Sequence, residues 1–555
     1  MSIRPITGTG RRGRIAALAA AAALLLIALL DGLICARAGL GRTGSWSFPI
    51  DDAYIYANYV RGAEAGGLFQ YNPGEQSGGV TGAGWMLLLL VAHPLTGLLG
   101  DAPAGLAPTA AQSVMPATAL TAGRLYLAAY GWGALLLAGA ALACGWLAWE
   151  ITRALPPPAA WTAALLAGGA LLADQNVVWG AYSGLELPLS LLLIALAPAT
   201  LLYELRVHGL TRSQPLRWSL PAVALLPWAR PELAVVGAAG VLWLAWGAAR
   251  GRGSWRTVAA YGAAVLAGLA ALAAFFWWGT GYPLPSSFYA KVAGARLDTL
   301  TAALQEWVLA GAWQPFALSS AAALGTGLLY WAGRRAAKAP SRTPAPAGLP
   351  ALCALAYFAA MLITLRWFGQ EDRYILPIHA LALPLAAGGI AVLAARLPAF
   401  RTPVAGRTWV AGAAVVALLA LGVHIATLRV WASSDYALFI QNIEDAHVAP
   451  ALWLAANAAP GAVVAAEPIG AVRLFSGHPT VDIVGLTTPA QLGHYQDWPA
   501  TRALLRARNA QYLLFYPRWW PTPNQPLPWA HEAQRFLVPD NRIAGDSPIA
   551  VYRLD

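Results

Sequence analysis

Long apolar runs separated by short polar segments dominate the first 428 residues of the chain. Most runs approach the roughly 20 residues that an α-helix needs to cross a hydrocarbon core of about 30 Å. The first run ends at Cys35. The later runs cover 124–149, 158–173, 183–203, 217–229, 231–248, 257–279, 311–332, 348–368, 374–396 and 407–428. Together they predict about eleven membrane-spanning helices.

Arginines set the predicted orientation of these helices. The segment 11–14 is arginine-rich and precedes the first run, so the positive-inside rule places the N-terminus in the cytoplasm. A cleaved signal peptide is the alternative, because residues 36–38 resemble a cleavage site, but the long run and the helices after it favour an uncleaved span. The other arginine-bearing loops, also expected in the cytoplasm, are 204–217, 249–256, 333–347 and 397–407.

The segment Trp85–Leu99 is apolar but contains His93 and Pro94. A crossing there would move the later arginines to the outer side, so we interpret it as a juxtamembrane or re-entrant helix on that side. The predicted topology has an odd number of spans. It has a cytoplasmic N-terminus and an extracytoplasmic C-terminus in the plasma membrane.

Composition supports this interpretation. Of 555 residues, 58% are hydrophobic and 11% are charged, whereas about 25% of a soluble globular protein is charged. The net charge of +11 comes from basic clusters between apolar runs, so we expect no nucleic-acid partner. The cysteines lack CxxC spacing and there is no GxxxxGK[ST] loop, which argues against a zinc site and a built-in ATP motor.

The tail, 429–555, has the pattern of a small α/β domain. A helical pattern covers about 441–458 and stops before Pro460. Strand-like runs follow at Val463–Ala466, Val481–Val484, Tyr512–Tyr516 and Ile549–Tyr552. We therefore predict a polytopic α-helical membrane domain (1–428, with a first outer loop at 36–123) and a C-terminal extracytoplasmic α/β domain (429–555).

The first outer loop carries the most distinctive chemistry, the adjacent carboxylates Asp51 and Asp52. Two neighbouring carboxylates repel each other, and burial near a bilayer raises a carboxyl pKa. One of them is then suited to act as a general base near neutral pH while the other orients a hydroxyl or a metal. The alternative is that the pair caps a helix beginning at Ala53, since aspartate favours that position.

Several segments in this loop and beyond it resemble bacterial GT-C glycosyltransferases that use polyprenyl-phosphate sugars, most of all the mycobacterial terminal arabinofuranosyltransferase branch. They are DDAYIYANYV (51–60), YNPGE (71–75), GGVTGAGWMLLLL (78–90), YSGLELPL (182–189), WARPELAVV (228–236), YPLPSSFYAKV (282–292), DRYILP (372–377) and PIGAVRLFSGHPTVDIVGL (468–486). Two positions depart from the branch: GVTG at 79–82, and Ser286-Ser287 before the YAK segment.

The resemblance implies a GT-C-like fold and an inverting transfer from a sugar on an isoprenoid phosphate. An aspartate of the first outer loop removes the proton from the acceptor hydroxyl. In this chain that role falls to Asp51, with Asp52 as a supporting carboxylate or alternative base. The glycosyl transition state resembles an oxocarbenium ion and needs a base on one side and a stabilised leaving group on the other.

The leaving group is a phosphate anion, which needs cations. Candidates on the predicted outer side are Lys291, Arg373 and Arg230. Each has a structural alternative. Lys291 could be a solvated loop charge, Arg373 an interfacial anchor, and Arg230 part of a local ion pair with Glu232 at a helix-hairpin turn.

Other side chains are candidates for contact with the substrates. They are Tyr54, Tyr71, Glu75, Glu186, Glu232 and Tyr289. Asp51, Asp52 and Glu186 have the oxygen ligands that Mg²⁺ or Mn²⁺ prefers. Both a metal-dependent and a metal-free reaction are compatible with the sequence.

The predicted function is transfer of a sugar, a pentofuranose or a hexose, from a polyprenyl-phosphate donor to a cell-envelope glycan, lipid or protein acceptor. The alternative is a transporter or flippase of lipid-linked sugars. Such a protein places charges near the bilayer midplane and often shows an inverted repeat. Here the carboxylates gather at outer helix ends and no repeat is evident. A non-catalytic envelope scaffold is the third possibility.

Overall fold

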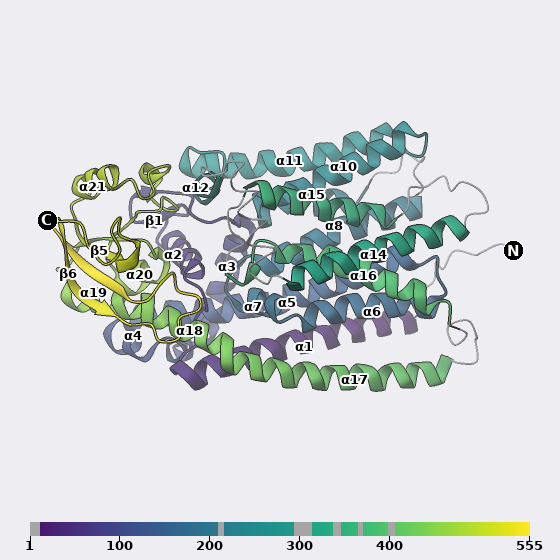
Figure 1. Ribbon diagram of the computed structural model, residues 1–555, viewed down its shortest axis with the longest axis horizontal. Coiled ribbons are helices and arrows are strands. Elements are labelled where there is room, and N and C mark those ends of the chain that lie inside the picture. The colour runs from purple at the N-terminus through teal and green to yellow at the C-terminus, as the bar shows by residue number, and fades with distance from the viewer. Residues whose placement is uncertain (1–10, 209–215, 293–312, 337–345, 365–369, 398–405) are drawn as a thin grey trace.

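The computed structural model describes residues 11–208, 216–292, 313–336, 346–364, 370–397 and 406–555. A bundle of long, roughly parallel helices carries a small α/β domain at one end (Figure 1). The amino end of the first described helix lies at the opposite end of the bundle (Figure 1). The predicted fold class, a helical membrane protein with a C-terminal sheet domain, is therefore confirmed.

Each of the predicted apolar runs contains a helix in the structure. The bundle helices are α1 (Arg11–Thr43), α5 (Pro116–Thr152), α6 (Pro157–Ala173), α8 (Leu187–His208), α9 (Ser219–Ala229), α10 (Ala234–Ala249), α11 (Trp255–Thr280), α14 (Trp313–Ala336), α15 (Gly348–Thr364), α16 (His379–Ala394) and α17 (Gly406–Trp431). Among the described residues, 6 helices are long and apolar enough to cross a membrane. The number of crossings and the orientation stay predictions.

Shorter elements lie between the bundle helices in the sequence. They are α2 (Asp52–Glu64), β1 (Gln70–Asn72), β2 (Glu75–Gln76), α3 (Ala83–Thr96), η1 (Gly97–Leu99), η2 (Ala102–Leu106), α4 (Thr109–Val114), α7 (Gln175–Tyr182), η3 (Pro231–Leu233), α12 (Ser286–Val292), η4 (Gln370–Asp372) and η5 (Leu376–Ile378). Helix α3 has 14 residues. At 1.5 Å per residue it is about 21 Å long, shorter than the hydrocarbon core. It lies at the domain end of the bundle (Figure 1).

One continuous helix joins the bundle to the α/β domain. Helix α17 continues through the π-helical turn η8 (Ala432–Tyr436), α18 (Ala437–Ile443), the second π-helical turn η9 (Glu444–Val448) and α19 (Ala449–Asn457). The predicted helix at about 441–458 is the end of this element. The predicted domain boundary at 428 and 429 therefore falls inside a helix.

The sheet of the α/β domain has the strand order β4–β3–β5–β7–β6. Its strands are β3 (Val463–Ala466), β4 (Thr480–Asp482), β5 (Ala510–Phe515), β6 (Ala530–Phe536) and β7 (Ile549–Leu554), and its short helices are α20 (Ile469–Ser476), η10 (Pro489–Gln491), α21 (Trp498–Ala507) and η11 (Pro517–Trp519). Strands β4, β3 and β5 are parallel, whereas β7 and β6 are antiparallel. The four predicted strands are confirmed. Strand β6 was missed because it lies at an edge and is mostly exposed, so its sequence is polar.

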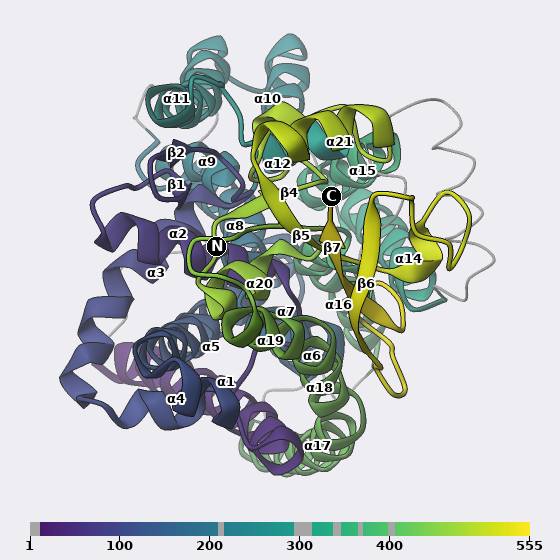
Figure 2. The same cartoon turned by 90° about the vertical axis from the view of Figure 1, so that its left-hand side faces the viewer.

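The α/β domain sits over the bundle and contacts the first outer loop (Figure 2). Helix α20 follows β3, so its amino end lies where the parallel strands end. The side chains of α2 from Ala53 to Val60 are buried, which explains the apolar and aromatic sequence of this helix. Tyr54 of α2 packs edge-on against Phe475 of α20, with ring centroids 5.7 Å apart. The bundle and the domain therefore share one hydrophobic core.

Candidate active site

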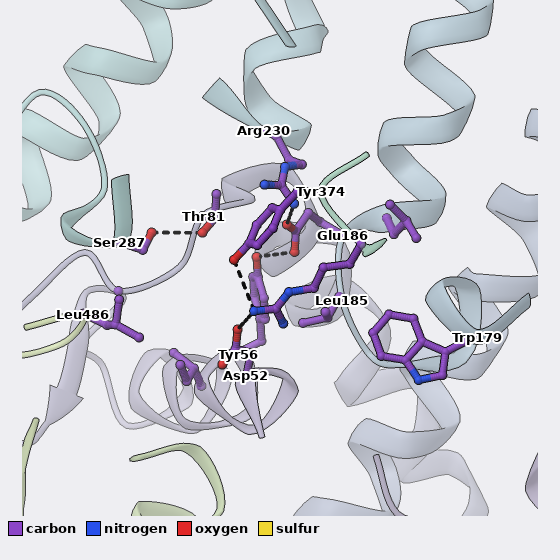
Figure 3. A pocket seen from close by; sticks show the side chains of 14 residues that line it. Asp52, Tyr56, Thr81, Trp179, Leu185, Glu186, Arg230, Ser287, Tyr374 and Leu486 are labelled. Atoms are coloured by element: carbon purple, nitrogen blue, oxygen red, sulfur yellow. Dashed lines mark hydrogen bonds and ion pairs between the residues drawn. The ribbon is translucent and has the colours of Figure 1, made fainter. Parts of the chain in front are cut away.

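A pocket lies where the first loop, the bundle turns and the α/β domain meet (Figure 3). Its lining residues are Asp52, Ile55, Tyr56, Gly79, Thr81, Trp179, Leu185, Glu186, Leu187, Arg230, Ser287, Arg373, Tyr374 and Leu486. Every segment that carries the family resemblance contributes to this lining except YNPGE. Residues far apart in the sequence are thus gathered into one site.

Asp51 does not line this pocket and binds the α/β domain. The residue is 8% exposed. One carboxylate oxygen accepts the N–H of Gly470 at 2.8 Å and the other accepts that of Ala471 at 2.9 Å. Burial alone would raise the pKa of Asp51, but neighbouring His447 and these two N–H groups lower it below its usual value. A carboxylate held in this way is a weak base.

Asp51 does not cap its own helix either. It occupies the position before α2, but its side chain makes no hydrogen bond to the amino end of that helix. Helix α2 begins at Asp52, one residue before the predicted start. The alternative in which the pair caps a helix from Ala53 is therefore wrong. Asp51 caps α20, a helix more than 400 residues away in the sequence.

Asp52 faces the pocket and meets a cation there. Its side chain is 36% exposed, and Oδ2 lies 2.8 Å from Nη2 of Arg373. The same Nη2 donates to the hydroxyl of Tyr374 at 3.2 Å. Arg373 is buried, yet its Nε and Nη1 have no hydrogen-bond partner among the described residues. Buried N–H groups are costly to leave unpaired, so these two are available for an anionic ligand.

Arg230, in contrast, is already paired. Its Nη1 lies 3.1 Å from Oε1 of Glu186, and its Nε donates to Oε1 of Glu232 at 2.6 Å. Tyr56 donates to the other oxygen of Glu186 at 2.8 Å (Figure 3). The ring of Tyr374 lies between the two guanidinium groups, 4.8 Å from that of Arg230 and 5.0 Å from that of Arg373. The local ion pair expected for Arg230 and Glu232 is present, and it orients the pocket wall.

The remaining predicted contact residues lie elsewhere. Tyr54 is fully buried, and its hydroxyl bonds with Ser47 at 3.0 Å and Tyr126 at 3.2 Å. The hydroxyl of Tyr71 donates to the carbonyl of Ile469. We predicted both tyrosines as sugar contacts, but they pack beneath the α/β domain because aromatic residues there fill its interface.

Two other predicted contact residues do not line the pocket. Glu75 forms an ion pair with Arg508 that links the first loop to the α/β domain. The ring of Tyr289 packs against Tyr282 and Phe288. Lys291 belongs to α12, but its side chain lies outside the described residues, so its role as a phosphate ligand stays a prediction.

Further side chains line the pocket. Tyr56, one of the loop tyrosines suited to contact a sugar, lies four residues after Asp52, so the helical period places both on one face of α2. The hydroxyls of Thr81 and Ser287 lie 2.9 Å apart. Both belong to the segments that depart from the family pattern, and their contact shows that these departures meet at one wall of the pocket (Figure 3).

The arrangement does not fit the metal ligands considered from the sequence. Among the described residues, no group of three or more His, Cys, Asp or Glu side chains is placed to hold a metal ion. Asp51 is bound to α20, and Glu186 is bound to Arg230 and Tyr56. Asp51, Asp52 and Glu186 therefore do not form one ligand set.

Solved structures share this architecture. An oligosaccharyltransferase from Archaeoglobus fulgidus in the apo form has a TM-score of 0.54 at 13% identity, covering 89% of this chain and 70% of that chain. The same archaeal enzyme, AglB, with an inhibitory peptide and a dolichol-phosphate has a TM-score of 0.52 at 13% identity, covering 89% and 69%. ArnT from Cupriavidus metallidurans, bound to undecaprenyl phosphate, has a TM-score of 0.51 at 16% identity, covering 98% of each chain.

The chain has the GT-C fold. At these identities the likeness concerns the fold. A family described as a domain of unknown function (DUF8728) matches residues 441–552, which include most of the α/β domain. No curated protein sequence matches this chain significantly. The arabinofuranosyltransferase branch stays a prediction. Within the GT-C fold, Asp52 and Arg373 lie where the first outer loop meets the bundle.

Glu467, a buried carboxyl group of the α/β domain, should make the stability of the folded protein depend on pH. It follows β3, and burial together with Asp51, Asp482 and Asp52 raises its pKa from 4.5 to about 8. The folded state thus holds this proton more tightly than the unfolded chain, and stability falls as the pH rises from about 4.5 to about 8. We expect Glu467→Gln to flatten that fall, because glutamine cannot ionise.

Thermal unfolding of both proteins in detergent across this range measures the effect. The variant should gain melting temperature over the wild type as the pH rises towards about 8, and the two should converge below about 4.5. Parallel curves for the two proteins would show that Glu467 keeps an ordinary pKa.

Proposed function

We propose that this chain is an inverting glycosyltransferase that moves a sugar from a polyprenyl-phosphate donor to an extracytoplasmic glycan, lipid or protein acceptor. One observation carries the proposal: a partly exposed carboxylate, Asp52, lies against a buried arginine, Arg373, whose Nε and Nη1 have no hydrogen-bond partner in the described part of the chain. The reaction needs a base on one side of the anomeric carbon and cations for the departing phosphate on the other. The undecaprenyl phosphate of ArnT and the dolichol-phosphate of AglB support a lipid phosphate as the donor's carrier.

In this mechanism Asp52, rather than Asp51, is the base. Asp52 accepts the proton of the acceptor hydroxyl as that oxygen bonds to the anomeric carbon. The bond between the anomeric carbon and the phosphate oxygen breaks, and its electron pair leaves with the polyprenyl phosphate. Nε and Nη1 of Arg373 stabilise the negative charge on that phosphate. Attack from the face opposite the phosphate inverts the anomeric centre.

The paired groups have orienting roles. Glu186 and Glu232 hold Arg230, and Arg230 supports the ring of Tyr374, which in turn accepts a hydrogen bond from Arg373. Lys291 stays a candidate for the donor phosphate. The hydroxyl pair of Thr81 and Ser287 borders the pocket and is suited to contact the donor sugar, either a pentofuranose or a hexose.

The proposal also concerns placement. The α/β domain would lie outside the plasma membrane, and the N-terminus would lie in the cytoplasm. The ends of α8 and α10 near Arg206 and Arg250 lie at the bundle end away from the domain (Figure 1). Arginine-bearing ends on one side agree with the positive-inside rule.

The test is a transfer assay with purified protein in lipid vesicles. A panel of radiolabelled polyprenyl-phosphate pentoses and hexoses is mixed with a cell-envelope extract as the source of acceptor. We expect label to move from one donor to an acceptor, with release of polyprenyl phosphate. If no donor supports transfer but the protein moves labelled donor across the vesicle membrane, the flippase alternative replaces the proposal.

A further inference from the structure

We propose that the α/β domain is a positioning module for the catalytic carboxylate. The amino end of α20 binds Asp51 as its resident anion, and this bond fixes the start of α2 so that Asp52 faces Arg373. Asp51 is then a positioning residue that acts through its neighbour. The inference rests on the proposed function for its catalytic consequence and assigns a role to the region 441–552.

The amino end of α20 is shaped for a carboxylate. Its free N–H groups and the helix dipole favour negative charge, and the end lies beside the carboxyl edge of the parallel strands, where α/β sheets bind ligands. In this chain the oxygens of Asp51 take two of those N–H groups, at 2.8 and 2.9 Å. No external anion is needed to satisfy them.

Gly470 makes this approach possible. A Cβ atom at this position would lie 2.2 Å from the backbone oxygen of Asp51 and 3.0 Å from its Oδ2. The closest of these is backbone, which cannot swing aside. Any side chain at Gly470 would therefore push α20 and the start of α2 apart.

A second part of the domain holds the same carboxylate. His447 lies in the π-helical turn η9, and its Nδ1 is 3.2 Å from Oδ1 of Asp51. Its Nε2 bonds with the hydroxyl of Tyr516, which follows β5, at 2.9 Å. The wider π-helical turn changes the direction in which the following side chains point, and such turns are frequent at functional sites. Asp51 thus accepts two hydrogen bonds from α20 and lies within ion-pair distance of His447 in the long connecting helix.

The rest of the first loop follows the same edge of the domain. Asn58 donates to the carbonyl of Gly470 at 2.9 Å. Asn72 donates to the carbonyl of Thr480 at 2.8 Å and accepts its N–H at 3.0 Å. These bonds go to the backbone of the domain, so they fix the register of α2 and β1 against it.

The two adjacent carboxylates therefore serve different partners. Asp51 binds the α/β domain, whereas Asp52 pairs with Arg373 of the bundle. Successive residues on a helix point about 100° apart, so holding one sets the direction of the other. The domain also supplies Leu486 to the pocket lining. Docking of the domain and assembly of the site are the same event.

The experiment compares Asp51→Asn, Gly470→Ala and His447→Gln with a matched control, Asp497→Asn. Asp497 caps α21 of the same domain, accepting the N–H of Ala500 at 3.2 Å, and does not line the pocket. Full-length protein in vesicles is assayed for kcat and KM of transfer over a range of pH, and amide hydrogen exchange is followed at α2 and α20.

We expect the three test variants to exchange faster at α2 and α20 and to lose kcat by about 10- to 100-fold, as misplacement of a catalytic group by about 1 Å does. KM for the donor and the shape of the pH profile should stay as in the wild type, because Arg373 and Asp52 remain. The control should change neither exchange at α2 and α20 nor transfer. His447→Gln keeps both hydrogen bonds from α20 to Asp51. It therefore tests the contact between His447 and Asp51 separately from those bonds.

Three results would overturn the inference. Complete loss of transfer in Asp51→Asn with unchanged exchange would make Asp51 the base. Faster exchange with unchanged kcat in all test variants would show that docking does not position Asp52. Unchanged hydrogen exchange at α2 and α20 in the test variants would show that Asp51 does not hold the α/β domain in place. Hydrogen exchange can be measured even if the wild type transfers no sugar and the proposed function fails.

Discussion

Asparagine in place of Asp52 is expected to lower sugar transfer about 10³-fold, the middle of the range for loss of a general base. Asparagine keeps the size of the side chain but cannot accept the proton of the acceptor hydroxyl. Binding of the donor should be retained, because Arg373 is still present and loses a competing carboxylate. Single-turnover transfer of radiolabelled sugar, alongside donor binding, measures both effects.

The matched comparison for this variant is Asp51→Asn, which removes the same charge one residue earlier. It should retain more transfer than Asp52→Asn, and the two should differ in hydrogen exchange at α20. Equal transfer by Asp52→Asn and the wild type would exclude Asp52 as the base and leave the pocket without one.

Replacing Arg373 by glutamine is expected to lower kcat/KM about 10²- to 10³-fold, since hydrogen bonds from charged groups to buried anions contribute about 3–4 kcal/mol to transition states. The variant loses the Nε and Nη1 donors, for which the described residues provide no acceptor. Arg373→Lys should recover only part of the loss, because lysine carries a point charge and cannot grip phosphate with two parallel bonds. Initial rates at varied donor concentration measure the effect.

Arg535→Gln is the control for loss of an arginine. Arg535 lies on the exposed strand β6, where it pairs with Glu532 at 2.6 Å. It should transfer sugar as the wild type does. Polyprenyl phosphate, the released product, should inhibit the wild type more strongly than Arg373→Gln. Equal inhibition of the two proteins would contradict the phosphate role of Arg373.

The sequence was sufficient for the bundle and for most of the sheet. Long apolar runs predict helices independently of the tertiary contacts that these helices make. Strands β3, β4, β5 and β7 are largely buried, so their sequences are apolar and predict strands. Strand β6 escaped notice because one edge strand in contact with solvent needs no apolar run. The continuation of α17 beyond residue 428 was not predicted, because the π-helical turn η8 that extends the helix has a polar sequence that composition alone does not mark as helical.

The sequence predicted which segments line the site, but not which side chains in them form pairs. Adjacent aspartates look alike in sequence, and their difference comes from partners far along the chain: Gly470 for Asp51 and Arg373 for Asp52. Arg230 stays a predicted phosphate ligand, but its hydrogen bond to Glu186, 44 residues away in the sequence, was not predicted. Long-range pairing of charges is a property of the packed fold, so local spacing carries no signal for it.

The unbroken helix from α17 to α19 has a consequence for how this protein can be divided. A fragment that begins at residue 429 starts within a rod and leaves the buried side of α18, with Leu438, Phe439 and Ile440, without its cover from α1. Severing the rod also leaves the first N–H groups of the fragment and the last carbonyls of the bundle half without helical partners. Because one helix runs through the junction, a foreign module joined there needs a splice in phase with that helix.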